Sequence, residues 1–471
     1  MSTPRPSGAD PKYAWAEIAG KDLPKRTPEQ RLADFHETHF PFDEATAREQ
    51  ASRCVQCPRP GCVVRCPVNS PIERWLELTA QGEFLEAAKL ASESTPIAEI
   101  CSRLCARDHL CEDACILNGP SEPVSIGAIE EFLAEYGLAH GVESAAAAPT
   151  NGRGIAVLGT GVASLACASE LVRRGFAVTM IARAERPGGF LLRGTSTLRI
   201  DEAIVARRVE MLKERGVEFR MGVLPGRDVS LARLREDFDA VFVGWDSRRA
   251  RALEVPGGDL PGVVQGKEFV GHARGENLAG IPGVDVAGGR VVVIGEDDTA
   301  VDCARTALRR GAVEATCVCP HPVGALACCR REFEDAEEEG VRFRFEETPV
   351  SLAAGADGRV TVVRLASTRR TEGGGWEAIP GSGQELGADW VILALGVEAE
   401  PEPFEGDFRA LAAGAAGMAV VDARQMTSVP GVFAGGDVVR GPCEVVVAIR
   451  DAKAAAAEIE AYVKERAASG S

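Results

Sequence analysis

The stretch of residues 155–181, IAVLGTGVASLACASELVRRGFAVTMI, decides the fold. The apolar run Ile155–Leu158 ends in the turn Gly159-Thr160-Gly161, a helical pattern covers Leu165–Arg174, and a second apolar run follows at Ala177–Ile181. A strand, a glycine turn, a helix and a returning strand form the opening unit of a doubly wound parallel sheet. The sequence therefore predicts an α/β architecture.

The same arrangement recurs later in the chain. The apolar run Arg290–Ile294 ends at Gly295, a helical pattern covers Thr299–Arg310, and another apolar run follows at Thr316–Val318. Two such units predict two Rossmann-like domains, which suit two nucleotides, or one nucleotide and a relic of a second site.

The first glycine turn has most of the features of a dinucleotide site. Gly159 permits the tight turn, and Gly161 lets the backbone approach a diphosphate at the helix N-terminus, while Ser164 stands at the third glycine position. The acidic residue expected at the end of the second strand is replaced by Ala182. The later motif Gly435-Gly436-Asp437 suits the ribityl or phosphate group of a flavin. A Rossmann-like core without a ligand remains the alternative.

The second glycine turn reads Gly295-Glu296-Asp297-Asp298-Thr299-Ala300, with Gly295 and Thr299 as its candidate contacts. Three carboxylates stand where a diphosphate would lie. Two like charges about 4 Å apart repel by about 1 kcal/mol in water and about 4 kcal/mol near a protein surface. A helix N-terminus offers an anion at most about 2 kcal/mol. The turn therefore predicts a weak or absent NAD(P)H site.

Eight of the 15 cysteines fall between residues 54 and 115. The first half reads Cys54-x2-Cys57-x4-Cys62-x3-Cys66-Pro67, and the second half reads Cys101-x3-Cys105-x5-Cys111-x3-Cys115. Zinc sites usually present paired C-x2-C knuckles, and only one such pair occurs here. A Cys-x3-Cys-Pro ending is typical of bacterial ferredoxins. The spacing favours two [4Fe–4S] clusters, with zinc or unliganded core thiols as alternatives.

Composition excludes several classes of protein. The chain has 471 residues and a net charge of −17, so nucleic acid and anionic membranes are not expected partners. Its apolar runs are far shorter than the roughly 20 residues of a membrane helix, and residues 1–15 have no apolar signal segment. We expect no membrane insertion and a cytoplasmic location. The Pro-rich residues 1–50 are expected to form an irregular arm, and residues 141–154 a linker.

Taken together, these motifs resemble the small (beta) subunit of NADPH-dependent glutamate synthase. They also resemble the large subunit of NADH-dependent ferredoxin–NADP oxidoreductase and the N-terminal part of dihydropyrimidine dehydrogenase. The resemblance covers about residues 30 to 465, and its motifs are the cysteine run, Ile126–Glu130, Arg186–Gly189, Val255–Val263, Ala304–Leu308 and Phe433–Gly441. It implies a helical iron–sulfur domain followed by two Rossmann-like domains in a disulfide-oxidoreductase-like arrangement.

The resemblance also implies the site residues. Cys54, Cys57, Cys62 and Cys115 would hold one cluster; Cys66, Cys105, Cys111 and Glu130 would hold the other, with Cys101 as a bystander; Gly188, Gly189 and Arg199 would contact the flavin. The departures fall on the ligand-facing positions, among them Ala182, the stretch Gly194–Leu198 beside the flavin, and the acidic turn 295–300.

The expected domains are a helical domain with both clusters (1–145), a discontinuous FAD-binding domain (154–275 and 400–471) and an NAD(P)-binding-like domain (276–399). The predicted function is electron transfer between FAD, two clusters and a partner redox subunit or carrier protein in a hetero-oligomer, with no catalytic acid or base. Two alternatives stay open: an active NAD(P)H-dependent oxidoreductase of the glutamate synthase type, and a non-catalytic iron–sulfur adaptor.

Overall fold

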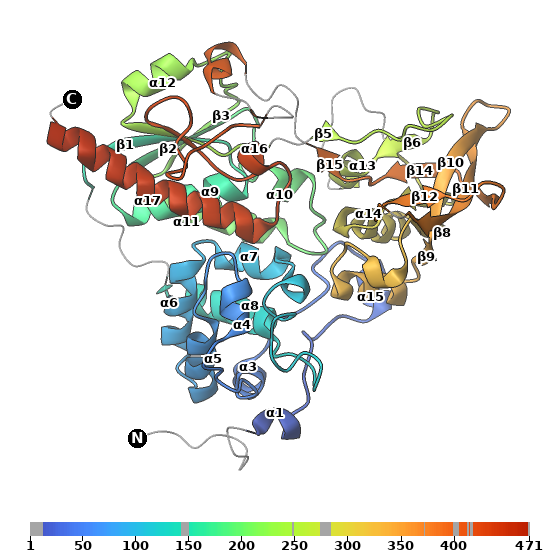
Figure 1. Cartoon of the computed structure of the whole chain (residues 1–471), viewed down its shortest axis with the longest axis horizontal. Coiled ribbons are helices and arrows are strands. Elements are labelled where there is room, and N and C mark those ends of the chain that lie inside the picture. Colours follow the sequence, from blue (N-terminus) through green and yellow to red (C-terminus); the bar gives the residue numbers. More distant parts are fainter. Residues whose placement is uncertain are drawn as a thin grey trace.

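A computed structural model describes residues 13–142, 150–246, 249–273, 284–371, 373–398, 405–411, 414 and 418–469. It has three parts: a helical N-terminal part, shown in blue and cyan in Figure 1, and two α/β parts above it. Residues 143–149, which are half of the expected linker, and the first twelve residues lie outside the described range.

The helical part is built around amphipathic helices. In α5, the side chains of Ile72, Trp75 and Leu76 are buried at helical spacing, and the helix ends at Gly82, whose left-handed φ of 84° suits glycine. They join a core to which Phe84 and Phe132 also contribute. The helices are α3 (Glu44–Ala51), α4 (Gly61–Arg65), α5 (Ile72–Gln81), α6 (Phe84–Ser94), α7 (Ala98–Leu104), the 3-10 helix η1 (Arg107–His109) and α8 (Ile126–Ala139).

The first sheet is parallel, with the strand order β16-β4-β1-β2-β3. Its strands are β1 (Gly154–Leu158), β2 (Ala177–Ala182), β3 (Glu218–Met221), β4 (Ala240–Val243) and β16 (Val432–Ala434). Its helices are α9 (Val162–Arg173), α10 (Phe190–Arg193), α11 (Glu202–Glu214), α12 (Leu231–Asp237), α16 (Asp437–Arg440) and α17 (Val445–Ser469), with the 3-10 helix η4 (Gly406–Ala410). The strand order reverses between β1 and β4, so the crevice beyond their carboxyl ends is the expected ligand position.

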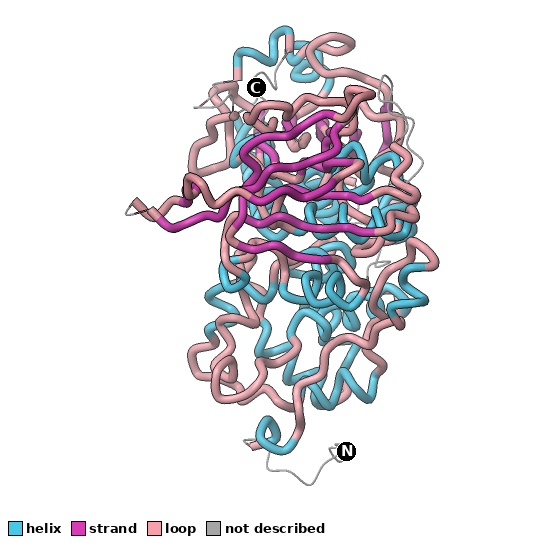
Figure 2. The backbone as a smooth tube through the Cα atoms, turned by 90° about the vertical axis from the view of Figure 1, so that its right-hand side faces the viewer, coloured by secondary structure: helices cyan, strands magenta, loops and turns pink. Residues whose placement is uncertain are grey.

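The second sheet is also parallel and has the order β6-β14-β7-β8-β9 (Figure 2). Its strands are β6 (Val263–Gln265), β7 (Arg290–Ile294), β8 (Glu314–Cys319), β9 (Arg342–Phe345) and β14 (Trp390–Leu393), with α13 (Gly266–Ala273), α14 (Asp298–Arg309), η3 (Val323–Ala325) and α15 (Arg330–Glu338). An antiparallel extension holds β10 (Glu347–Ala354), β11 (Val360–Arg370), β12 (Trp376–Ala378) and β13 (Gln384–Gly387), and a two-stranded bridge pairs β5 (Arg249–Ala250) with β15 (Val397–Glu398).

The structure joins β6 to the second sheet, because Val263–Gln265 pair in parallel with β14. The sequence-based boundary at residue 275 had assigned this strand and α13 to the first α/β domain. The α/β fold with a helical N-terminal domain and two Rossmann-like domains is confirmed.

The N-terminal arm is ordered against its own chain. It carries the short helices α1 (Ala14–Glu17) and α2 (Pro28–Leu32) and runs from α1, at the lower end of the helical part in Figure 1, to the second α/β part. Arg31, which is almost fully buried, forms ion pairs with Asp335 and Glu338 of α15. Arg305 of α14 donates to Thr38 of the arm at 2.6 Å and pairs with Glu339, the residue that follows α15. Buried ion pairs and a hydrogen bond therefore hold the arm against α14 and α15 of the second α/β part.

Candidate functional site

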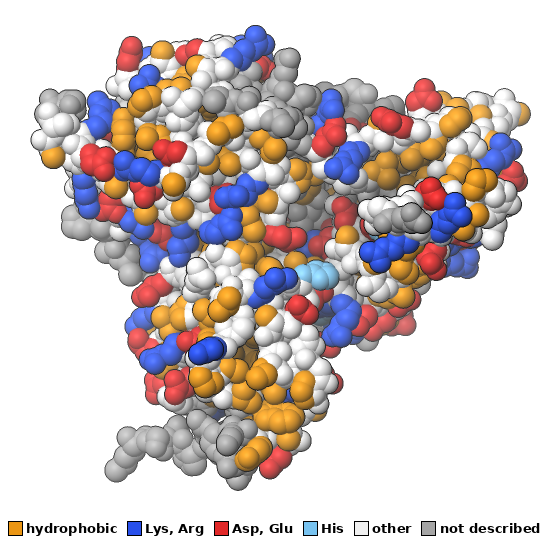
Figure 3. All heavy atoms as spheres, viewed as in Figure 1, with side chains coloured by type: hydrophobic (Ala, Val, Ile, Leu, Met, Phe, Trp, Pro, Cys, Tyr) orange, Lys and Arg blue, Asp and Glu red, His pale blue; other side chains and the backbone are white. Residues whose placement is uncertain are grey.

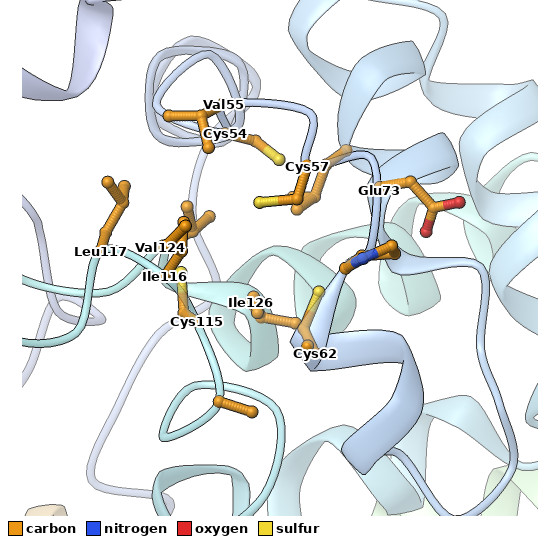
Figure 4. A pocket seen from close by; sticks show the side chains of 14 residues that line it. Cys54, Val55, Cys57, Cys62, Glu73, Cys115, Ile116, Leu117, Val124 and Ile126 are labelled. Carbon is orange, nitrogen blue, oxygen red and sulfur yellow. The ribbon is translucent and has the colours of Figure 1, made fainter.

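Four cysteines surround one hollow in the helical part (Figure 4). Cys54 follows α3, Cys57 lies in the next loop, Cys62 belongs to α4, and Cys115 follows η1; all four line the same pocket, and their sulfur atoms point into it. Gly61 makes this convergence possible, because a Cβ atom at this position would lie 2.5 Å from the carbonyl oxygen of Ala114. We call these cysteines the first thiol set.

The walls of this hollow are apolar, with Leu76 and Ile126 among them. Burial raises the pKa of the Cys54 thiol to about 11 and that of Cys62 to about 12. Thiolates at these positions need a bound cation to offset their charge. Among the described residues, no three His, Cys, Asp or Glu side chains form a group that fits a single metal ion.

A second group lies between α4, α7 and α8. Cys66 follows α4 and Cys105 follows α7. Burial raises the pKa of Cys111, and the charges of Glu112, Cys105, Glu130 and Cys66 raise it further. Burial raises the pKa of Glu130 to about 7. We call Cys66, Cys105, Cys111 and Glu130 the second thiol set. Cys101 lies beside it, fully buried and hydrogen-bonded to Cys105.

Arg107 supplies positive charge beside this second set. Its guanidinium group lowers the pKa of Glu130 against the effect of burial. Gly127 makes room for it, because a Cβ atom there would lie 2.1 Å from Cδ of Arg107. Arg107 was not predicted from the sequence. The available signal was Gly127 in the Ile126–Glu130 motif, because a glycine inside a helix indicates that another group packs closely against it.

The first glycine turn meets a second glycine pair in space. Gly159 has a φ of 101°, and a Cβ atom at Gly189 would lie 2.7 Å from Cα of Gly161. Helix α9 begins directly after Gly161 and has no side-chain cap, so its first N–H groups face the crevice at the switch point of the sheet. We call the turns Gly159–Gly161 and Gly188–Gly189 together the diphosphate cradle.

Ser164 and the motif Gly435–Asp437, both predicted from the sequence, border this cradle. Ser164 donates a hydrogen bond to the carbonyl oxygen of Leu158 (3.1 Å) or of Gly244 (3.0 Å), which explains why serine serves at the third glycine position. The motif Gly435–Asp437 begins α16, and a Cβ atom at Gly436 would lie 2.8 Å from Cβ of Ala163 in the first turn of α9. Both predicted glycine motifs of the first α/β part therefore meet at one crevice.

The second glycine turn is occupied by its own side chains. Asp297 caps α14 by accepting a hydrogen bond from the Ala300 N–H group at 3.0 Å. Glu296 lies 2.5 Å from Nδ1 of His321. Burial, reinforced by Asp298 and Glu296, raises the pKa of Asp297 to about 6. Gly295 still forms the predicted turn. Thr299 follows the acidic residues 296–298, however, so a diphosphate at this turn would meet negative charge.

Arg199 joins the two α/β parts. Its guanidinium Nη1 lies 3.0 Å from Oδ2 of Asp298 in the second glycine turn. Nearby, the Ser196 N–H group lies 3.4 Å from Oδ2 of the buried Asp302, whose Oδ1 has no hydrogen-bond partner. The stretch 194–199, predicted to border the flavin, thus contacts α14, which the sequence had not indicated.

Two family matches cover most of the chain. Residues 31–142 match the dihydropyrimidine dehydrogenase domain II, 4Fe-4S cluster family, and residues 153–452 match the pyridine nucleotide-disulphide oxidoreductase family. The glutamate synthase [NADPH] small chain of Azospirillum brasilense is 36% identical over 461 residues, which cover 94% of each chain. The Escherichia coli small chain is 34% identical and covers 94% of this chain and 97% of its own.

The chain belongs to the glutamate synthase small-chain family. As a member of this family it is an oxidoreductase, which confirms the resemblance inferred from its motifs.

The fold agrees with this membership. The Mycobacterium tuberculosis oxidoreductase FprA superposes with a TM-score of 0.58 and 20% identity, over 69% of this chain and 86% of that chain. This likeness concerns the two Rossmann-like parts. No helix of the described residues is long and apolar enough to cross a membrane.

Proposed function

We propose that this oxidoreductase is an electron-transfer subunit that holds FAD in its first Rossmann-like domain and two [4Fe–4S] clusters in its helical domain. It exchanges electrons with a redox subunit or carrier protein in a hetero-oligomer. The domains that we propose keep the sequence-based limits, with residues 263–273 moved to the NAD(P)-binding-like domain because of the β6 pairing.

The observation that carries this proposal is the order of the groups. Leu104, Cys105 and Leu110 pack against the core of the first α/β part, so the second thiol set adjoins the proposed flavin domain. Cys54, Cys62 and Cys115 of the first set pack only against the helical core. Cys66 and Cys111 of the second set also lie in or against the helical core, so the second set contacts both cores and the first set the helical one. This arrangement suits electron transfer from the flavin through the second set to the first.

Surface chemistry supports a partner at the first thiol set. Val64 of α4 is 80% exposed, and Ile116, which lines the first hollow, is 64% exposed. Figure 3 shows hydrophobic side chains gathered on the lower, helical part of the molecule. Exposed apolar side chains beside a redox site suit docking of another protein.

The chain's own groups fit these cofactors. Seven cysteines and Glu130, in two sets, are donors that would suit two iron–sulfur clusters, and the glycines of the cradle let the backbone come close to a diphosphate. A flavin in that cradle would supply exchange of electrons in pairs on one side and singly on the other. The protein supplies the backbone N–H groups of α9, the burial of the thiols and the docking face.

The acidic second turn supports the proposal that the electron donor of this chain is not NAD(P)H. The alternative, an active NAD(P)H-dependent oxidoreductase, is supported by the names of the relatives, which are NADPH enzymes. The adaptor alternative keeps the clusters and the fold without flavin.

One experiment separates these functions. The full chain is prepared anaerobically with FAD present, iron, acid-labile sulfide and bound FAD are measured, and flavin absorbance is followed after NADH or NADPH is added. We expect about eight iron atoms and one FAD per chain, and no bleaching within seconds. Colourless protein containing zinc would contradict the clusters. Rapid bleaching would support the NAD(P)H-dependent alternative, and clusters without flavin would support the adaptor.

A further inference from the structure

A carboxylate of the chain lies in the diphosphate cradle. Asp246 follows β4, on the opposite side of the switch point from the Gly159–Gly161 turn. A Cβ atom at Gly161 would lie 2.5 Å from Asp246 Oδ1, and a Cβ atom at Gly189 would lie 2.6 Å from Asp246 Oδ2. The absence of side chains at both glycines therefore leaves room that Asp246 fills.

The surroundings of this carboxylate suit an anion. The Phe190 N–H group donates a hydrogen bond to Asp246 Oδ2 at 2.7 Å. The first turn of α9, directly behind Gly161, has no side-chain cap and carries the positive end of a twelve-residue helix. A diphosphate would use the same N–H groups and the same gap between the glycines.

We propose that Asp246 is an internal occupant of the cradle, which the diphosphate of a dinucleotide must displace. This inference rests on the proposed flavin site and adds how that site is controlled. The carboxylate and a diphosphate cannot share the gap between Gly161 and Gly189, and at close range their charges repel. The chain therefore gains little of its affinity for FAD from the diphosphate itself.

The test compares wild type with Asp246→Asn, which keeps the size of the side chain and removes its charge. The probes are FAD, ADP and adenosine, measured by titration calorimetry on the full chain with its metal content verified. The matched control is Asp407→Asn in the same α/β part, because Asp407 also accepts backbone N–H groups, and these belong to Leu231 and Ala232 at the start of α12 and not to the glycine turns.

We expect Asp246→Asn to lower the Kd for FAD and for ADP at least tenfold and to leave the Kd for adenosine within twofold. Asp407→Asn should change none of the three. Wild type should bind ADP, which carries a diphosphate, no more tightly than adenosine, which does not. If the Asp246 variant fails to fold, this comparison alone tests whether Asp246 competes with a diphosphate.

Two results would overturn the inference. Wild type that binds ADP far more tightly than adenosine, or an Asp246→Asn chain with unchanged affinity for FAD and ADP, would show that the carboxylate does not compete, while the flavin site would stand. If neither wild type nor the variant binds FAD, the flavin part of the proposed function fails together with this inference.

Discussion

Replacement of Asp302 by Asn should make the contact between the two α/β parts less dependent on pH. Asp302 lies in α14 with 2% of its surface exposed, and its Oδ2 faces the N–H group of Ser196 in the 194–199 stretch. Burial raises its pKa to about 7, in spite of the opposing effect of Arg199. In the closed structure the group therefore keeps its proton up to about pH 7, whereas an opened, hydrated Asp302 ionises near its ordinary value of 3.8.

The sign and size of the effect follow from this difference. Between about pH 4 and pH 7 the opened state loses a proton that the closed state retains, so opening becomes easier as the pH rises. At about 1.36 kcal/mol per pH unit, the full effect is about 4 kcal/mol, of which about 3 kcal/mol falls between pH 5 and pH 8. An Asn at this position does not titrate and lacks this dependence.

Hydrogen exchange followed by mass spectrometry measures the opening of this contact in the intact protein. We compare peptides from 194–200 and from 298–309 at pH 5 and pH 8, after correction for intrinsic exchange rates. The opening free energy of Asp302→Asn, relative to wild type, should rise by about 3 kcal/mol from pH 5 to pH 8. Asp357→Asn in an exposed loop is the control, and it should show no such change.

A difference between Asp302→Asn and wild type that stays constant with pH would refute this reasoning. It would mean that Asp302 is ionised in the closed structure and that its attraction to Arg199 outweighs burial. A pKa below the ordinary value would give the same constant difference, because both states would then be ionised from pH 5 to pH 8.

Three further changes test other parts of the molecule. Cys62→Ser should remove about half of the iron, because Cys62 would hold one of the two clusters, whereas Cys101→Ser should retain all of it. Colorimetric assays of iron and of acid-labile sulfide measure both losses. Asp297→Ala should lower thermal stability by about 1 kcal/mol through loss of the cap of α14, and Asp297→Asn should not; equal losses would contradict the capping role. Arg305→Met leaves buried carboxylates without their partner, so it should cost about 3–5 kcal/mol and speed proteolysis of residues 23–43, whereas Arg364→Met in an exposed ion pair should change stability by less than about 1 kcal/mol.

The elements of the sheets were predictable because local pattern determines them. Ile155–Leu158 and Ala177–Ile181 are apolar on both faces, as strands buried in a parallel sheet must be, and the structure confirms them as β1 and β2. The cysteine spacing likewise indicated a cluster of thiols, and four of them face one hollow. The first signal lies within residues 155–181 and the second within residues 54–115.

The remaining features depend on segments that are distant in the sequence. The pairing of Arg31 with α15 joins residues about 300 positions apart, and no local pattern announces such a contact. Asp246 was missed although a signal existed. It follows β4, whose carboxyl end borders the switch point beside β1, and that is where side chains meet a ligand in a doubly wound sheet. The strand order was needed before this signal could be used.

The glycines of the two turns carry different information about ligands. At Gly295 a Cβ atom would lie 2.1 Å from the carbonyl oxygen of Ala394, and at Gly159 one would lie 2.8 Å from Cα of Trp245. Both contacts are with the backbone of the neighbouring strand's loop, so the fold itself requires glycine there whether or not a nucleotide binds. Gly161 differs, because its close neighbour is the side chain of Asp246. The packing of the sheet therefore requires the first glycine of each turn. Only the space beside Gly161 indicates whether a ligand can bind. The presence of Gly295 in the acidic turn is therefore no argument for NAD(P)H.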